Sequence, residues 1–182
     1  GSETLLFGAL IGVYVAYRVL YGHDFAEALH HNDQLLGTLN TIVLITSSFT
    51  AAMAVDAARS ESPRRVVWFL LATLFLASCF LIIKSYEYSA HFEEGIYPGL
   101  QYSNQELDSR GARLFFTLYF FMTGLHALHV IGGMIAITII ALAQRNRTYT
   151  REYHLPLELT VLYWHIVDVV WIFLWPLFYL LR

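Results

Sequence analysis

Three histidines and one aspartate stand in stretches that are otherwise almost free of charge. His126 and His129 are three residues apart, and His165 and Asp168 repeat that spacing. Residues three apart share one face of an α-helix. Neutral imidazole is a common ligand of zinc, copper and haem iron, so His129 and His165 could hold a haem or part of a metal centre. The alternative is that these histidines form hydrogen bonds inside the protein.

Carboxylates suggest a second kind of chemistry. Glu3, Glu158, His165 and Asp168 are the residue types from which transporters build proton relays. Transporters of that kind usually contain helices broken by Pro or Gly in mid-span. The only proline inside a predicted span is Pro176, near the end of the chain. A proton-coupled membrane carrier therefore stays an alternative, as does a haem-binding membrane anchor.

The elements that position these groups must lie in a membrane. Hydrophobic residues make up 57% of the 182 residues and charged residues 14%, against about 25% charged in ordinary globular domains.

The net charge of -3 excludes a strongly basic nucleic-acid binder, so we expect no nucleic acid partner. A single cysteine, Cys79, excludes an intrachain disulfide and a multi-cysteine metal site.

Runs without Asp, Glu, Lys or Arg give the number of spans. They cover 4–17, 34–55, 66–83 and 114–144, and the run 159–181 is interrupted only by Asp168. About 20 apolar residues in a helix cross a hydrocarbon core of about 30 Å. We predict an all-α integral membrane bundle, a single domain over 1–182. Its five transmembrane helices are predicted at about 4–21, 35–58, 66–88, 113–143 and 157–181.

The predicted helices carry their polar groups on defined faces. On helix 113–143, one stripe includes Tyr119, Met122, His126, His129, Gly133 and Ala136. On helix 157–181, a stripe includes Glu158, Val161, His165, Asp168, Ile172, Trp175 and Tyr179, and on helix 35–58 Asn40 begins a comparable seam. These spacings of three and four residues place the polar groups toward neighbouring helices.

Basic residues in the short loops predict the orientation. Arg59, Arg64 and Arg65 follow the second predicted helix, and Arg145, Arg147 and Arg151 follow the fourth. The positive-inside rule then places the N-terminus inside and the C-terminus outside. The first predicted helix is short and the sequence has no initiator Met, so we expect further residues upstream of Gly1.

Two long motifs resemble the paired signature of subunit III of haem-copper oxidases. They are FMTGLHALHVIGG at 121–133 and YWHIVDVVWIFL at 163–174. Three shorter stretches, at 2–7, 39–48 and 84–88, agree with that family in order. The resemblance covers essentially the whole chain and is to the five-helix form of the family.

This resemblance implies a subunit without a catalytic or redox centre and without a bound metal. Such a subunit packs beside the catalytic subunit I of a respiratory oxidase, holds phospholipid in a cleft, and supports proton uptake or oxygen access. Haem and copper are then expected in partner subunits. The resemblance favours the bacterial cytoplasmic membrane over the mitochondrial inner membrane. It leaves open whether cytochrome c or quinol is the donor, and whether the chain serves an oxidase or a nitric oxide reductase.

The resemblance also implies roles for individual residues. Glu3 corresponds to an intramembrane carboxylate that binds the histidine at the position of His129, and the other signature polar positions are His126, His165, Asp168, Glu87 and Asn40. At 1.5 Å per residue, a helix starting at residue 3 leaves Glu3 about a dozen Å in depth from His129. An upstream extension or a tilted first helix would bring the two together.

Overall fold

The computed structural model describes residues 2–60, 62–99, 102–104, 107, 109–145 and 155–181, except the side chains of 2–4 and 145. The chain divides into two compact units. Unit 1 comprises Gly1–Leu39, Ile83–His126 and Val170–Arg182, and unit 2 comprises Asn40–Ile82 and Ala127–Val169. Four of the long helices contribute a segment to each unit, and each unit is considered by itself.

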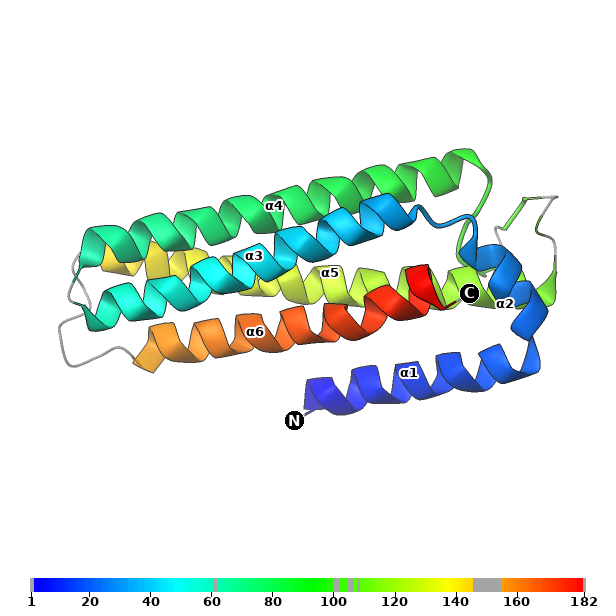
Figure 1. The fold of residues 1–182 in the computed structure, drawn as a ribbon, viewed down its shortest axis with the longest axis horizontal. Coiled ribbons are helices and arrows are strands. Elements are labelled where there is room, and N and C mark those ends of the chain that lie inside the picture. The colour runs from blue at the N-terminus through cyan, green and yellow to red at the C-terminus, as the bar shows by residue number, and fades with distance from the viewer. Residues whose placement is uncertain are drawn as a thin grey trace. The chain divides into compact units, whose positions relative to one another are not determined.

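Every regular element in the described part of the chain is a helix, as the sequence predicts (Figure 1). In chain order the elements are α1 (Ser2–Leu20), α2 (Gly22–Leu29), α3 (Gln34–Arg59), α4 (Pro63–Glu93), α5 (Arg110–Arg145), α6 (Leu155–Trp175) and the π-helical turn η2 (Pro176–Leu180). Pro63 stands at the first position of α4, where a proline costs no hydrogen bond. Pro176 follows the helical residue Trp175 directly and marks the change from α6 to the π-helical turn.

Four helices are long and apolar enough to cross a membrane: α3, α4, α5 and α6 with its π-helical end. A fifth span exists if α1 and α2, which are bent by 110° relative to each other, form one broken span. The all-α membrane fold is therefore confirmed, with four spanning helices in the described part of the chain, or five if α1 and α2 count together. Many large apolar side chains face outward, among them Trp68, Phe75 and Leu128, which suits a lipid or protein environment rather than water.

Two helix boundaries differ from the sequence expectation. The polar break at 22–33 contains α2, which is amphipathic and buries Phe25, Ala28 and Leu29. Helix α4 continues to Glu93 instead of ending near residue 88. Lys84, which the prediction placed near the end of its helix, therefore lies well inside α4.

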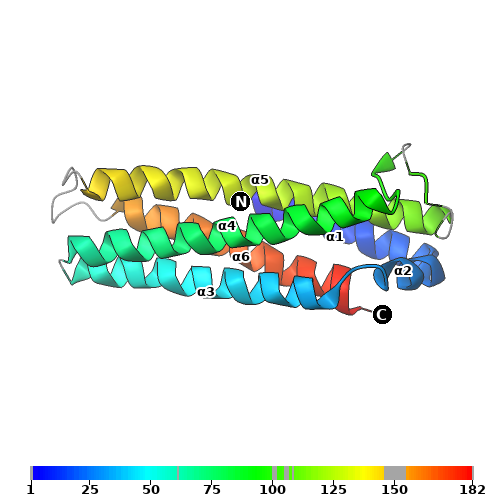
Figure 2. The same ribbon diagram turned by 90° about the horizontal axis from the view of Figure 1, so that it is seen from above.

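In unit 2, α3 and α4 run side by side in opposite directions (Figures 1 and 2). The hydroxyls of Thr50 on α3 and Thr73 on α4 join them at 2.8 Å. Gly133 on α5 lets the Trp164 ring of α6 approach closely, because an added Cβ would lie 2.7 Å from that ring. Small residues thus permit close helix contact where bulkier ones would separate the backbones.

Unit 1 has an aromatic core. Tyr14 of α1 packs edge-on against Phe25 of α2 and Phe178 of η2, with ring centroids 5.4 and 5.2 Å apart. Phe115 of α5 contacts both Phe25 and Phe178, at 5.4 and 5.7 Å. These edge-to-face contacts bring four elements around one centre and fix the surroundings of the polar groups described next.

Candidate functional site

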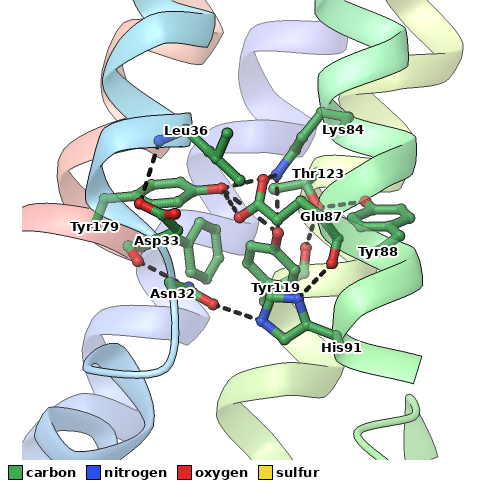
Figure 3. A network of polar contacts seen from close by, with 11 residues as sticks. Asn32, Asp33, Leu36, Lys84, Glu87, Tyr88, His91, Tyr119, Thr123 and Tyr179 are labelled. Carbon is green, nitrogen blue, oxygen red and sulfur yellow. Dashed lines mark hydrogen bonds and ion pairs between the residues drawn. The ribbon is translucent and has the colours of Figure 1, made fainter. Parts of the chain in front are cut away.

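The interior of unit 1 holds an ion pair that is almost fully buried. Lys84 Nζ donates to Glu87 Oε2 at 3.0 Å, one turn along α4. It also donates to the hydroxyls of Tyr119 on α5 and Tyr179 on η2, at 2.9 and 2.8 Å. Tyr179 donates in turn to Glu87 Oε1 at 2.5 Å. Figure 3 shows these side chains converging from three elements.

The surroundings of the Lys84 ammonium group satisfy its hydrogen-bond donors and its positive charge. An ammonium group has three donors, and each has an acceptor here. The ring of Tyr119 lies 4.7 Å from Nζ and that of Trp171 5.2 Å, within the range of cation–π attraction. The Glu87 carboxylate neutralises the charge, so all three donors and the charge of the ammonium group are compensated within the cluster. It is suited to holding helices together.

A second set of polar contacts continues from this cluster along α4. Tyr88 and Thr123 share a hydrogen bond of 2.6 Å between their hydroxyls. The Nδ1 atom of His91 lies 2.8 Å from the Glu87 carbonyl oxygen, and its Nε2 atom lies 3.0 Å from Asn32 Oδ1. Asn32, in the segment between α2 and α3, is thereby tied to α4 (Figure 3).

The carbonyl groups at the C-terminal end of the chain are also satisfied by distant side chains. Tyr14 donates to Leu177 O at 2.6 Å, Arg18 to Leu181 O at 2.6 Å, Asn32 to Phe178 O at 2.9 Å, and Gln34 to Tyr179 O at 2.7 Å. The last carbonyls of a helix have no partner within it. Donors from the N-terminal segment therefore secure the turn that carries the Tyr179 hydroxyl.

Unit 2 contains a smaller polar seam between α3 and α6. Ser48 Oγ lies 2.5 Å from Nδ1 of His165, and Trp164 donates from Nε1 to Ser47 Oγ at 3.1 Å. Asp168 is 5% exposed, and neither of its carboxyl oxygens has a hydrogen-bond partner among the described residues.

The structure distributes the predicted site residues over both units. In unit 1, Glu87 belongs to the closed cluster and the buried His126 ring lies 5.2 Å from that of Trp171. In unit 2, His165 contacts Ser48 of α3, and the buried Asp168 lies three residues further along α6.

The remaining predicted residues make fewer described contacts. The His129 carbonyl accepts a hydrogen bond from Tyr163 at 3.3 Å. Asn40 is fully buried, and its amide has no hydrogen-bond partner among the described residues. The side chain of Glu3 lies outside the described residues, so the predicted Glu3–His129 pair stays a prediction.

Sequence reasoning missed Lys84 and His91 as members of a site. The signal for Lys84 was present, since Lys84 and Glu87 are three residues apart on a helix and can pair there. Tyr119 and Tyr179 did fall on the predicted polar stripes. In the described part of the chain, no group of three or more His, Cys, Asp or Glu side chains could hold a metal ion.

Comparison with known proteins agrees with the motifs. A family model described as cytochrome c oxidase subunit III matches residues 29–181. Cytochrome c oxidase subunit 3 of Synechocystis is 31% identical over 181 residues, which is 99% of this chain and 71% of the relative. The relative from Corynebacterium diphtheriae with the same name is 31% identical over 184 residues, covering 100% of this chain and 83% of its own.

A fused relative adds information on assembly. The heme-copper oxidase subunit I+III of Aeropyrum pernix is 32% identical over 186 residues, which is 98% of this chain and 21% of the relative. In that protein, as its name states, subunits I and III form one polypeptide.

Proposed function

The chain belongs to the cytochrome c oxidase subunit III family, and from that premise we propose that it supports a catalytic oxidase subunit rather than carrying out redox chemistry itself. Membership makes it an integral membrane subunit of a haem-copper oxidase that works with other oxidase subunits. Its proposed tasks are to stabilise the catalytic subunit, to retain phospholipid, and to support proton uptake or oxygen access.

One observation carries this proposal. The strongest buried charges in unit 1, Lys84 and Glu87, neutralise each other, and both tyrosine hydroxyls beside them are engaged as well. A catalytic acid or base must be able to exchange a proton with a substrate. A catalytic metal site must keep an open coordination position. A cluster closed in this way supports a packing role. The fused relative supports subunit I as the immediate partner.

The test of this role is purification of the chain from its native membrane. We expect it to purify with a large haem-containing membrane subunit and with bound phospholipid, measured by the visible spectrum and by phosphorus content. A chain that is stable alone and shows its own haem Soret band, lost in His129→Ala or His165→Ala, would contradict the proposal. Proton-driven uptake by the chain alone in liposomes would also contradict it.

We further propose that Glu3 and His129 bind each other within the membrane. The motif positions support this pairing, because a carboxyl group within a membrane is costly to bury unless a polar partner meets it. Glu3→Ala should leave the haem spectrum of the complex intact while sustained turnover or lipid retention falls. Thr138→Ala on α5, the helix of His129, is a control, since that hydroxyl donates to the backbone of its own helix at Met134 O. Loss of the haem spectrum in Glu3→Ala, or equal effects of both substitutions, would reject the pair.

The proposed location is a bacterial cytoplasmic membrane with the N-terminus inside and the C-terminus outside. Arg59, Arg64 and Arg65 between α3 and α4 support this orientation. A periplasmic reporter enzyme fused after Arg182 should be active, whereas the same reporter placed between α3 and α4 should be inactive. The opposite pattern would reverse the orientation.

A further inference from the structure

His91 is a buried imidazole in the last turn of α4, close to one end of that membrane-spanning helix. Both of its ring nitrogens face an oxygen atom. Nδ1 lies 2.8 Å from the carbonyl oxygen of Glu87, and Nε2 lies 3.0 Å from Oδ1 of Asn32 (Figure 3). A neutral imidazole has one N–H donor, and its other nitrogen is an acceptor. A neutral His91 ring can therefore donate to only one of these two oxygens.

The orientation of the Asn32 amide follows from its second contact. Its Nδ2 atom donates to Phe178 O at 2.9 Å. A carbonyl oxygen can only accept, so the hydrogen-bond network requires the amide nitrogen at Phe178 and the amide oxygen at His91. Turning the amide over would place two acceptor oxygens against each other at Phe178. Since the Glu87 carbonyl also only accepts, all three contacts are satisfied together when both His91 nitrogens carry a proton.

We propose that His91 is a proton-binding site whose occupancy controls how Asn32 holds the C-terminal turn. In the proton-bound state, Nε2–H donates to Asn32 and Asn32 donates to Phe178 O. When the Nε2–H bond breaks, its proton passes to water and the ring becomes neutral. The Asn32 amide then turns over, donates to Nε2 and releases the Phe178 carbonyl. The site loses one positive charge, and the step needs no oxidant or reductant.

The surroundings of His91 compensate the charge of the proton-bound ring. An isolated charge is costly in an apolar interior, but here both N–H groups have an acceptor. The last turn of a helix also favours a cation, because its carbonyl groups carry the negative end of the helix dipole. Three rings of α5 have centroids 5.5, 5.5 and 6.0 Å from that of His91, within the roughly 6 Å over which ring faces attract a cation. They are Phe116, Tyr119 and Phe120.

The other charged groups around His91 are engaged with partners of their own. Lys84 and Glu87 neutralise each other one and two turns back along α4, and the hydroxyls of Tyr119 and Tyr179 bind Lys84. Four charged side chains of the neighbouring segments contact other groups: Asp24 of α2, Asp33 between α2 and α3, Glu94 after α4, and Arg113 of α5. The two nitrogens of His91 therefore meet uncharged oxygens, and Asn32 is the side chain that can respond to the proton.

The first test is nitrogen NMR of the intact purified oxidase complex, with its histidine rings labelled, as a function of pH. His91→Gln identifies the His91 signals by their loss. We expect both His91 nitrogens to be protonated at low pH and Nε2 to lose its proton as the pH rises. Asn32→Leu removes the acceptor and should move this titration to lower pH. Asn32→Asp supplies a carboxylate acceptor and should move it to higher pH.

The second test is hydrogen–deuterium exchange of Pro176–Leu180 in the same complex. Relative to His91→Gln at the same pH, protection of this segment in the parent chain should fall over the range in which Nε2 loses its proton. The glutamine amide can donate to Asn32 at any pH, so it removes the pH response. His31→Gln is the matched control, because His31 adjoins Asn32 but is exposed and lies 4.0 Å from Glu94. It should keep the response of the parent chain.

Two results would overturn the proposal. One is an Nε2 atom of His91 that stays unprotonated throughout the pH range in which the complex remains folded. The other is the same pH response of Pro176–Leu180 in the parent chain and in His91→Gln. The proposed function uses neither His91 nor Asn32, so either result would leave it standing.

Discussion

Lys84 and Glu87 bind each other at 3.0 Å on α4 while their side chains are only 5% and 2% exposed. Arg59 and Glu158 in unit 2 form a pair of the same length, but with side chains that are 68% and 40% exposed. The two pairs are alike in geometry and differ in surroundings. The energetic cost of breaking each pair therefore differs in size, because removing one partner of a buried pair leaves an uncompensated charge in an apolar interior.

We therefore predict that Lys84→Met lowers the free energy of unfolding by about 3 kcal/mol or more. Adding Glu87→Gln to that variant should recover part of the loss, because the unpaired carboxylate is removed as well. Arg59→Ala should change stability by less than about 1 kcal/mol. Denaturation in detergent, monitored by circular dichroism, measures all three. Strictly additive effects of the Lys84 and Glu87 substitutions would refute the coupling.

The Tyr179 hydroxyl has two roles in this cluster, since it accepts from Lys84 and donates to Glu87. Tyr179→Phe removes both contacts and leaves one ammonium donor and one carboxylate oxygen without this partner. We expect a loss of about 2 to 3 kcal/mol, the range for hydrogen bonds to charged groups. Tyr86→Phe on the outward face of α4, where Tyr86 is 67% exposed, should be neutral in the same unfolding assay. Equal stability of the two variants would contradict the assigned role.

Several parts of this arrangement could be predicted from the sequence. The uncharged runs located the four long helices, and spacings of three and four residues placed Tyr119 and Tyr179 on polar stripes. One assumption misled the reading of Lys84. A charged residue was expected only near the end of a span, whereas α4 continues to Glu93 and Glu87 neutralises the Lys84 charge inside the helix.

Other parts could not be predicted, because they depend on which helices meet. The contact between Lys84 and Tyr179 joins residues 95 positions apart, and nothing in either local pattern specifies that partner. Helix α2 was not predicted because it is short and mixed in polarity. Its apolar face becomes evident only in the structure, where Phe25 packs in the aromatic core. The choice of partner is a property of packing, not of local sequence.

The end of the chain offers a test of such long-range contacts. Asn32 donates to Phe178 O and accepts at Oδ1 from His91, so it joins the C-terminal turn to α4. Asn32→Ala should leave this carbonyl unpaired and speed backbone amide exchange in Pro176–Leu180. His30→Ala provides the comparison, because His30 is exposed and lies two residues away. Hydrogen–deuterium exchange with mass spectrometry measures the exchange rate of this segment directly. Unchanged exchange in Asn32→Ala would contradict a stabilising contact between Asn32 and the C-terminal turn.

Two adjacent glycines on α5 test the packing of unit 2. A Cβ added at Gly133 would lie 2.7 Å from the Trp164 ring, whereas one at Gly132 would approach only the Tyr163 hydroxyl, at an ordinary 3.6 Å. Gly133→Ala must displace a fully buried indole that also donates to Ser47, so we expect a loss of about 1 to 3 kcal/mol. Gly132→Ala should instead be neutral or gain up to about 1 kcal/mol from helix propensity. Unfolding of the two variants under the same detergent conditions decides the matter, since a Gly133→Ala variant as stable as Gly132→Ala would mean that α5 and α6 are not in close contact at this position.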